Sequence, residues 1–408
     1  MQRQRVRKSV NAAIKDGLAW AVMSGFADPY AVPCALSLGA STMAVGYLRS
    51  LPALASSFSQ FFTERLVLRL GSCKKSVLAA VFTQALSLFA AAFCVFLPAG
   101  AALPVFIFLV ALCNVSGNLS GPPWLALMGE YLPASKRGAF FGFRFQLVGV
   151  TFFTASFLAA GFLDFFGEGI LWGFASLFAA AGLFRLLSFY YLTLLYEPKT
   201  RFHMPQKVPL KLLAAFDFRQ NRVSAMFFSA FLMLSATFLA APYFSVYALK
   251  ELNYDYLHYT VIMTIGPLMT YLFMKKWGLA ADAFGSVKIL KAAFLIIPTV
   301  PFLWTLSRNF YFLALVELYS GIIWGAYIIG MNNFIYDSTA RAERTGCNAA
   351  FAFVGGLAQF GGALLGGWLY DFLPPIGGSR FITLLIISGV LRAAAIIPFF
   401  KLVKEENR

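Results

Sequence analysis

Four ionisable side chains interrupt long apolar runs of this sequence: Asp28, Arg49, Arg185 and Glu317. A charge inside a membrane is costly, so such a group usually faces a partner or a water-filled cavity. Carboxylates at these places carry protons or bind donor groups, and guanidinium groups bind anions. Asp28, Arg49 and Glu317 are therefore candidates for substrate binding or proton coupling.

Asp28 is followed by Pro29, and this pair predicts a kinked helix with a carboxylate at the kink. Proline lacks a backbone donor, so the carbonyl of Gly25 loses its usual partner. The alternative is that Asp28 forms a structural ion pair with Arg49, which would disfavour a proton-carrying role.

The other charged residues each have two interpretations. Arg49 is either the ion-pair partner of Asp28 or a ligand for an anionic group of the substrate. Glu317 is either a second coupling or substrate-binding carboxylate or a group that extends to the outer surface. Arg185 and Arg392 lie in the inner halves of their apolar runs, and we expect both to extend to the cytoplasmic surface.

Uncharged polar and aromatic residues supply further candidates. Asn114 and Asn118 recur at helical spacing and so share one face. That face either lines a cavity or makes hydrogen bonds between helices, and the same choice applies to Asn332. Tyr30 and Tyr243 either flank a ligand or pack beside the two predicted kinks.

The composition indicates an all-α polytopic membrane protein. Of 408 residues, 60% are hydrophobic and only 12% are charged, about half the charge of a soluble domain. A spanning helix needs about 20 apolar residues, so the length suits about twelve spans. We place them at 14–37, 42–63, 75–97, 103–128, 139–163, 169–195, 223–249, 256–275, 287–306, 310–335, 346–370 and 380–402.

The net charge of +16 does not indicate nucleic-acid binding. Most Lys and Arg residues lie in short clusters between alternate apolar runs, which is typical of cytoplasmic loops. Both termini are therefore expected on the cytoplasmic side. We expect the protein itself to lie in the cell (plasma or inner) membrane. The five cysteines have no metal-binding spacing, and neither His203 nor His258 belongs to an enzyme motif, so we expect no metal, cofactor or enzymatic activity.

A weak internal repeat predicts two six-helix halves. Residues 27–36 and 240–249 share Ala, Pro, Tyr, Ala and Leu at an offset of 213, and this places Pro242 at a second kink. Gly71 and Gly285 differ by 214. We expect an N-terminal half at 1–196, a basic cytoplasmic linker at 197–222 and a C-terminal half at 223–408.

A polar stretch from Lys275 to Lys288 separates two apolar runs and contains Gly278, Asp282 and Gly285. The glycines allow a tight turn, and Asp282 suits a helix N-terminus. Gly-x3-Asp-x2-Gly followed by basic residues resembles the loop signature of the major facilitator superfamily of secondary transporters. Together with the helix number, the central basic loop and the repeat, the resemblance covers essentially the whole chain.

The resemblance implies that spans 1, 4, 7 and 10 line a central cavity, which favours Glu317 on span 10. It also implies a cytoplasmic gating loop, and we expect Asp282 to face Arg137, Gly138 or Arg144. Drug antiporters of the superfamily carry a Gly-Pro pair in helix 5; span 5 here has no proline, which favours uptake or symport.

The sequence therefore predicts a monomeric secondary transporter that moves a small organic solute by alternating access. The solute, a proton or another ion, and the lipid bilayer are the expected partners. The alternative is a membrane sensor or scaffold that has the same fold and does not transport.

Overall fold

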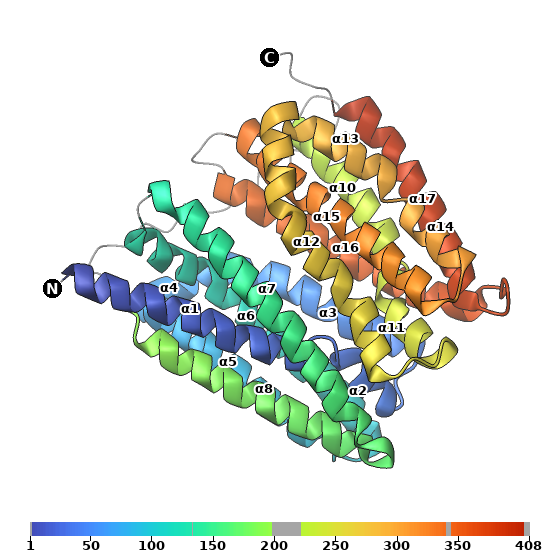
Figure 1. The fold of residues 1–408 in the computed structure, drawn as a ribbon, viewed down its shortest axis with the longest axis horizontal. Coiled ribbons are helices and arrows are strands. Elements are labelled where there is room, and N and C mark those ends of the chain that lie inside the picture. Colours follow the sequence, from blue (N-terminus) through green and yellow to red (C-terminus); the bar gives the residue numbers. More distant parts are fainter. Residues whose placement is uncertain (1, 133, 198–221, 340–343, 404–408) are drawn as a thin grey trace. The chain divides into compact units, whose positions relative to one another are not determined.

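The computed structural model describes residues 2–132, 134–197, 222–339 and 344–403 (Figure 1). Within these ranges nearly all residues are helical and no β-strand forms; one isolated bridge pairs Ile376 with Ser379. Nearly all of the predicted linker, 198–221, lies outside the described residues.

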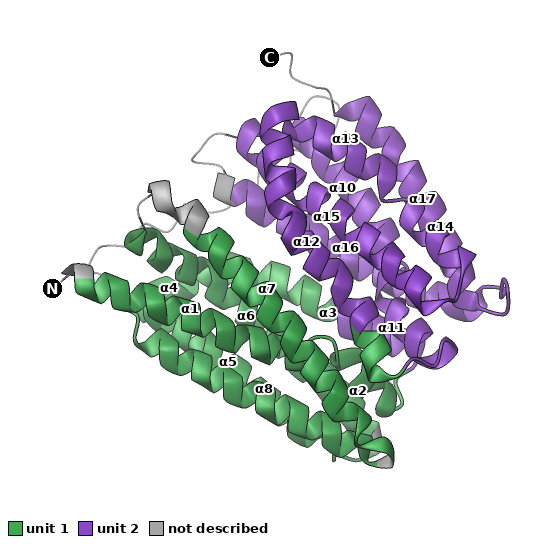
Figure 2. Ribbon diagram, viewed as in Figure 1, with its two compact units in different colours: residues 1–40, 51–204, 255–260 green, residues 41–50, 205–254, 261–408 purple. Residues whose placement is uncertain are grey.

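The helices group into two compact units (Figure 2). Unit 1 comprises residues 1–40, 51–204 and 255–260, and unit 2 comprises residues 41–50, 205–254 and 261–408. The start of α3 (Thr42–Ser59) is thus grouped with unit 2, and the start of α12 (Tyr256–Phe284) with unit 1.

Unit 1 is built on α5 (Cys73–Cys94), which packs against α6 (Ala99–Tyr131) and α8 (Ile170–Thr193). The first helix, α1 (Gln2–Ala27), packs on α8 and on α7 (Ala134–Asp164). Two shorter helices complete this unit, α2 (Ala31–Ser37) and α4 (Thr63–Leu70). The core between them is apolar, as the hydrophobic runs predicted.

Unit 2 is built on α10 (Arg222–Phe238), which packs against α16 (Arg344–Phe372) and α17 (Arg380–Leu402). Two further helices, α13 (Ser286–Ile296) and α14 (Thr299–Leu306), pack on α17 and on α15 (Phe310–Ser338), which also contacts α10. Their buried side chains form a continuous apolar core in which Phe294 stacks on Phe399 at a centroid distance of 4.1 Å.

Two helix breaks lie at the repeat-related Pro-Tyr pairs. Helix α1 ends at Ala27 and α2 begins at Ala31, so Pro29 lies in the break. Helix α10 ends at Phe238; a 3₁₀ turn that contains Pro242 follows it, then the short helix α11 (Phe244–Val246) and a π-helical turn. Backbone groups freed at such breaks need other partners, so breaks inside a membrane usually border a cavity or a packed side chain.

Ten helices in the described part of the chain are long and apolar enough to cross a membrane. They coincide with ten of the twelve predicted spans. The predicted spans 14–37 and 42–63 do not meet this criterion, because the break at Pro29 divides the first and Arg49 lies within the 18-residue α3 of the second. A number of twelve is therefore not confirmed.

The turn predicted at Gly278 is wrong. Helix α12 continues through Lys275, Gly278 and Asp282 to Phe284, and the chain turns at Gly285 with φ of +92°. The stretch around Gly278 is rich in Lys, Leu and Ala, which favour helix enough to outweigh one glycine. Asp282 is exposed in the last turn of α12 and does not lie at a helix N-terminus.

These two glycines form a matched pair for a stability test. We expect Gly285→Ala to lower the free energy of unfolding by about 1 kcal/mol, because alanine is strained at positive φ. Gly278→Ala is expected to raise it by up to about 1 kcal/mol, because this helical glycine has open space around it. Thermal unfolding of the purified variants measures both, and a stabilised Gly285→Ala variant would contradict the assignment of the turn.

Candidate functional site

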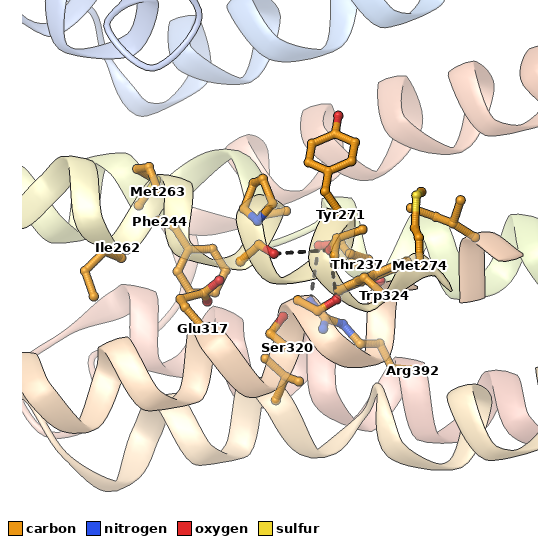
Figure 3. A pocket seen from close by; sticks show the side chains of 17 residues that line it. Thr237, Phe244, Ile262, Met263, Tyr271, Met274, Glu317, Ser320, Trp324 and Arg392 are labelled. Atoms are coloured by element: carbon orange, nitrogen blue, oxygen red, sulfur yellow. Dashed lines mark hydrogen bonds between the residues drawn. The ribbon is translucent and has the colours of Figure 1, made fainter. Parts of the chain in front are cut away.

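A cavity of about 470 Å³ lies within unit 2, between helices α10, α11, α12, α14, α15 and α17 (Figure 3). Its walls include aromatic and thioether side chains: Phe244, Met263, Tyr271, Met274 and Trp324. Its volume lies in the range of small-molecule sites, which are commonly apolar with a few polar groups that fix orientation.

Glu317 reaches this cavity from α15. Its Oε1 accepts a hydrogen bond of 2.8 Å from Nε1 of the buried Trp304 on α14. Helix α12 comes close to α15 here, because Gly266 and Gly321 have no side chains to separate the two backbones. A Cβ on Gly266 would lie 3.2 Å from Oε2 of Glu317. The carboxylate is thus held at the cavity wall.

Arg392 reaches the same cavity from α17 and is only 3% exposed. Its Nε donates to Ser388 Oγ at 3.1 Å, and its Nη2 donates to the carbonyl of Thr237 at 3.5 Å. The serine hydroxyl in turn donates to the carbonyl of Ala236 at 2.6 Å. The expectation that Arg392 extends to the cytoplasmic surface is therefore wrong, because α10 and Ser388 hold the guanidinium inside the unit.

Glu317 and Arg392 are the two charged residues among those that line the cavity. Their charges interact, but they form no direct ion pair within the described residues. Ser320 and Thr270 add hydroxyl groups to the same walls. The cavity therefore offers an anionic acceptor and a cationic donor to a solute whose body contacts aromatic and methionine side chains.

Comparison with known families decides what kind of protein carries this cavity. Residues 17–274, more than half of the chain, match the family model described as Major Facilitator Superfamily. The chain belongs to this superfamily. It is therefore a multi-pass membrane protein of a transporter family, as the resemblance of its sequence predicted.

Three solved transporter structures share the fold of this superfamily member. The nucleoside transporter NupG gives a TM-score of 0.73 at 15% identity, over 98% of this chain and 100% of that chain. A D-xylose-proton symporter gives 0.68 at 14%, over 98% and 97%. A bacterial homolog of the human lysosomal transporter Spinster gives 0.70 at 11%, over 97% and 96%. No curated protein sequence matches.

Unit 1 of this Major Facilitator Superfamily protein also buries an arginine. Arg185 on α8 is 3% exposed, so the expectation that it extends to the cytoplasmic surface is wrong. Its Nη1 donates to Ser188 Oγ at 2.9 Å, and that hydroxyl donates to Asp16 Oδ1 at 2.6 Å. Asp16 also pairs with Arg144 Nη2 at 3.5 Å. The buried carboxylate of Asp16 thus interacts with two guanidinium groups, directly with that of Arg144 and through Ser188 with that of Arg185.

Sequence reasoning missed that these two arginines are related by the repeat. Gly182-x-x-Arg185 and Gly389-x-x-Arg392 lie 207 residues apart. In each unit the glycine packs on a phenylalanine ring: an added Cβ would come within 3.0 Å of Phe89 or 2.7 Å of Phe302. The shared Gly-x-x-Arg pattern in two apolar runs was the signal that could have identified both sites.

The two repeat-related tyrosines are fully buried, and their hydroxyls are used by the protein. Tyr30 donates to the carbonyl of Ser156 on α7 at 2.5 Å, and Tyr243 donates to the carbonyl of Ala363 on α16. These two carbonyls are also 207 residues apart. The geometry supports the packing alternative, in which each tyrosine joins a helix break to a neighbouring helix.

Asp28 is exposed at the break between α1 and α2, and Ser24 donates a hydrogen bond to its Oδ2. Arg49 is exposed on α3. These residues belong to different units, so an ion pair between them stays a prediction.

The predicted asparagines are all exposed. Asn114 and Asn118 lie on α6, where each side-chain amide donates to the carbonyl four residues earlier, at 2.9 Å and 3.0 Å. Asn332 lies near the end of α15. Their part in substrate binding stays a prediction.

The predicted contact of Asp282 with Arg137, Gly138 or Arg144 also stays a prediction. Arg144 packs its guanidinium over the ring of Trp124 at 4.4 Å, donates from Nε to the carbonyl of Ala13 at 3.2 Å, and pairs with Asp16. It belongs to unit 1 and Asp282 to unit 2. The side chain of Arg137 lies outside the described residues.

The charge network of unit 1 can be tested with two aspartates of the same span. We expect Asp16→Asn to lower the free energy of unfolding by about 3 kcal/mol, because it leaves the buried guanidinium of Arg185 and the partly buried one of Arg144 without their carboxylate. Asp28→Asn, at an exposed site, is the matched control, with an expected change below about 0.5 kcal/mol. Chemical unfolding of the purified variants measures both; equal losses would contradict the network.

Proposed function

We propose that this protein is a secondary active transporter of a small organic solute, that it works by alternating access of its two six-helix halves, and that it is proton-coupled. The observation that carries the proposal is the cavity of unit 2, which both Glu317 and Arg392 line together with aromatic side chains. A largely apolar cavity that holds two opposite charges suits recognition of a polar solute more than static packing, because charged groups in apolar surroundings are costly without a partner.

Coupling to a gradient follows from the chemistry of the chain. The sequence has no phosphate-binding loop, so the energy for accumulation must come from an ion or from the solute itself. Carboxylates inside membrane helices are the usual proton carriers of transporters. Glu317 is the first candidate, because it lines the cavity, and Asp28 is the second, because it lies at a helix break.

The proposed orientation follows the distribution of basic residues. Clusters such as Lys74-Lys75 and Lys275-Lys276 would face the cytoplasm, where cationic loops are retained during insertion. Both termini would then be cytoplasmic, in the cell membrane, and the monomer would be the working unit. The solute would reach the cavity alternately from the two aqueous sides.

The experiment uses proteoliposomes that contain a pH-sensitive dye. Solutes from a metabolite panel that raise the melting temperature are added outside, one at a time. We expect at least one to be accumulated and to acidify the lumen, and Glu317→Gln to reduce the acidification by more than about tenfold, because glutamine carries no exchangeable charge. Glu130→Gln, at an exposed position on α6, is the control.

Two results would contradict the proposal. Solute accumulation with unchanged luminal pH would exclude proton coupling. Solutes that bind without being accumulated would favour the alternative of a sensor or scaffold on the same fold.

A further inference from the structure

We propose that the solute of this cavity is an organic monoanion with an aromatic or otherwise apolar body, and that Glu317 takes up one proton when the anion binds to Arg392. This inference rests on the proposed function, because it names the substrate class of the same cavity. It follows from which atoms of the two charged groups are free, from the charge balance of the site and from the chemistry of its walls.

The guanidinium of Arg392 has capacity left for a ligand. Its Nε and Nη2 are engaged by Ser388 and by the carbonyl of Thr237, whereas Nη1 has no acceptor among the described residues. The 3.5 Å bond of Nη2 is also long, so this nitrogen can turn towards a stronger acceptor. A carboxylate that lies against the guanidinium would replace these weak contacts with charge-assisted hydrogen bonds.

Glu317 has one engaged and one open oxygen. Oε1 accepts the hydrogen bond from Trp304, and Oε2 lies beside Gly266 without a donor among the described residues. An indole N–H can donate to a charged or to a neutral carboxyl group, although the bond to the charged form is stronger. Trp304 can therefore hold the carboxyl group in place both before and after Glu317 binds a proton.

Charge balance selects the ligand. Glu317 and Arg392 are the charged residues of the cavity lining, so the empty site is neutral overall. An anion on Arg392 would leave a net negative charge in a poorly hydrated site, unless the carboxylate of Glu317 binds a proton from the aqueous phase and becomes a neutral acid. Anion and proton then bind together, each favours the other, and the loaded site is neutral again.

The groups that face Glu317 allow this exchange. Helix α17 contributes Arg392, α14 contributes the uncharged Trp304, and α12 contributes the phenol of Tyr271. Helices α10 and α11 contribute Thr237 and Phe244, which do not titrate. Arg392 is therefore the other charged side chain of the cavity lining, so an anion that binds to Arg392 changes the charge around the carboxyl group of Glu317.

The walls select the body of the ligand. Phe244, Tyr271 and Trp324 present aromatic surfaces, and Met263 and Met274 present polarizable thioethers that adapt to different shapes. A strongly hydrated inorganic anion would gain little from such walls. A carboxylate on an aromatic or branched apolar group would use both the guanidinium and the walls.

A series of four probes that share a phenyl body tests this inference: phenylacetate, phenylacetamide, 2-phenylethylamine and phenylalanine. They are anionic, neutral, cationic and zwitterionic at neutral pH. Binding to the purified protein is measured by calorimetry in buffers of different ionisation enthalpy, which reports both affinity and proton uptake. We expect phenylacetate to bind at least about tenfold more tightly than the others, with uptake of about one proton per anion.

Three variants separate the roles of the two residues. Glu317→Gln resembles the protonated acid, so it should still bind phenylacetate but without proton uptake. In the wild type, phenylacetate affinity should fall by up to about tenfold per pH unit as the pH rises above neutrality, and this dependence should vanish in Glu317→Gln. Arg392→Gln should weaken phenylacetate binding by about tenfold to a hundredfold. The double variant Glu317→Gln/Arg392→Gln leaves no unpaired charge in the cavity. It therefore tests the role of Arg392 in phenylacetate binding without the cost of an unpaired carboxylate.

The inference is overturned if phenylacetate binds without proton uptake, if the cationic or zwitterionic probe binds more tightly, or if no probe binds. Uptake of labelled phenylacetate into proteoliposomes distinguishes this failure from failure of the proposed function. Proton-linked binding without uptake into liposomes would contradict the transporter and leave the anion site intact. Transport of other solutes without anion-linked protonation would contradict the anion site and leave the transporter intact.

Discussion

A guanidinium group buried in a helical membrane protein costs several kcal/mol unless a counter-charge and hydrogen bonds compensate it. This constraint governs both units, because Arg185 and Arg392 occupy equivalent positions of the repeat and are equally buried. In each unit a serine hydroxyl contacts the guanidinium, at Ser188 or Ser388. The surrounding helices must therefore bring a carboxylate close to each arginine.

The two units meet this requirement differently. In unit 1, Asp16 serves Arg185 through Ser188 and pairs with Arg144, so the carboxylate is fully used by the protein. In unit 2, Glu317 and Arg392 face a cavity and are not in direct contact. The repeated arginine thus belongs to a charge network in one unit and lines a cavity in the other. The difference between the two units is of the kind that duplication followed by divergence produces.

Much of the fold was predictable from the sequence, and part of the site was. Long apolar runs predicted the helices, and a lone acid inside one of them identified Glu317, because a charge there needs a reason. Arg392 was misjudged, because its position near the inner end of a run does not reveal that Ser388 and α10 enclose it. The continuation of α12 through Gly278 was also missed, because single glycines mark turns only when the backbone requires positive φ. The first error concerns tertiary surroundings and the second the local backbone conformation, and hydrophobic periodicity encodes neither.

The central claim is that the cavity around Glu317 is reached by a solute from both sides of the membrane. Ser320 lines that cavity, and all five native cysteines are free thiols that can be replaced, so a single cysteine at Ser320→Cys reports on access. The measurement is its labelling by a membrane-impermeant maleimide in right-side-out and in inside-out vesicles. The account predicts labelling from both sides, with protection by a bound solute. Labelling from one side only, or from neither, would contradict it.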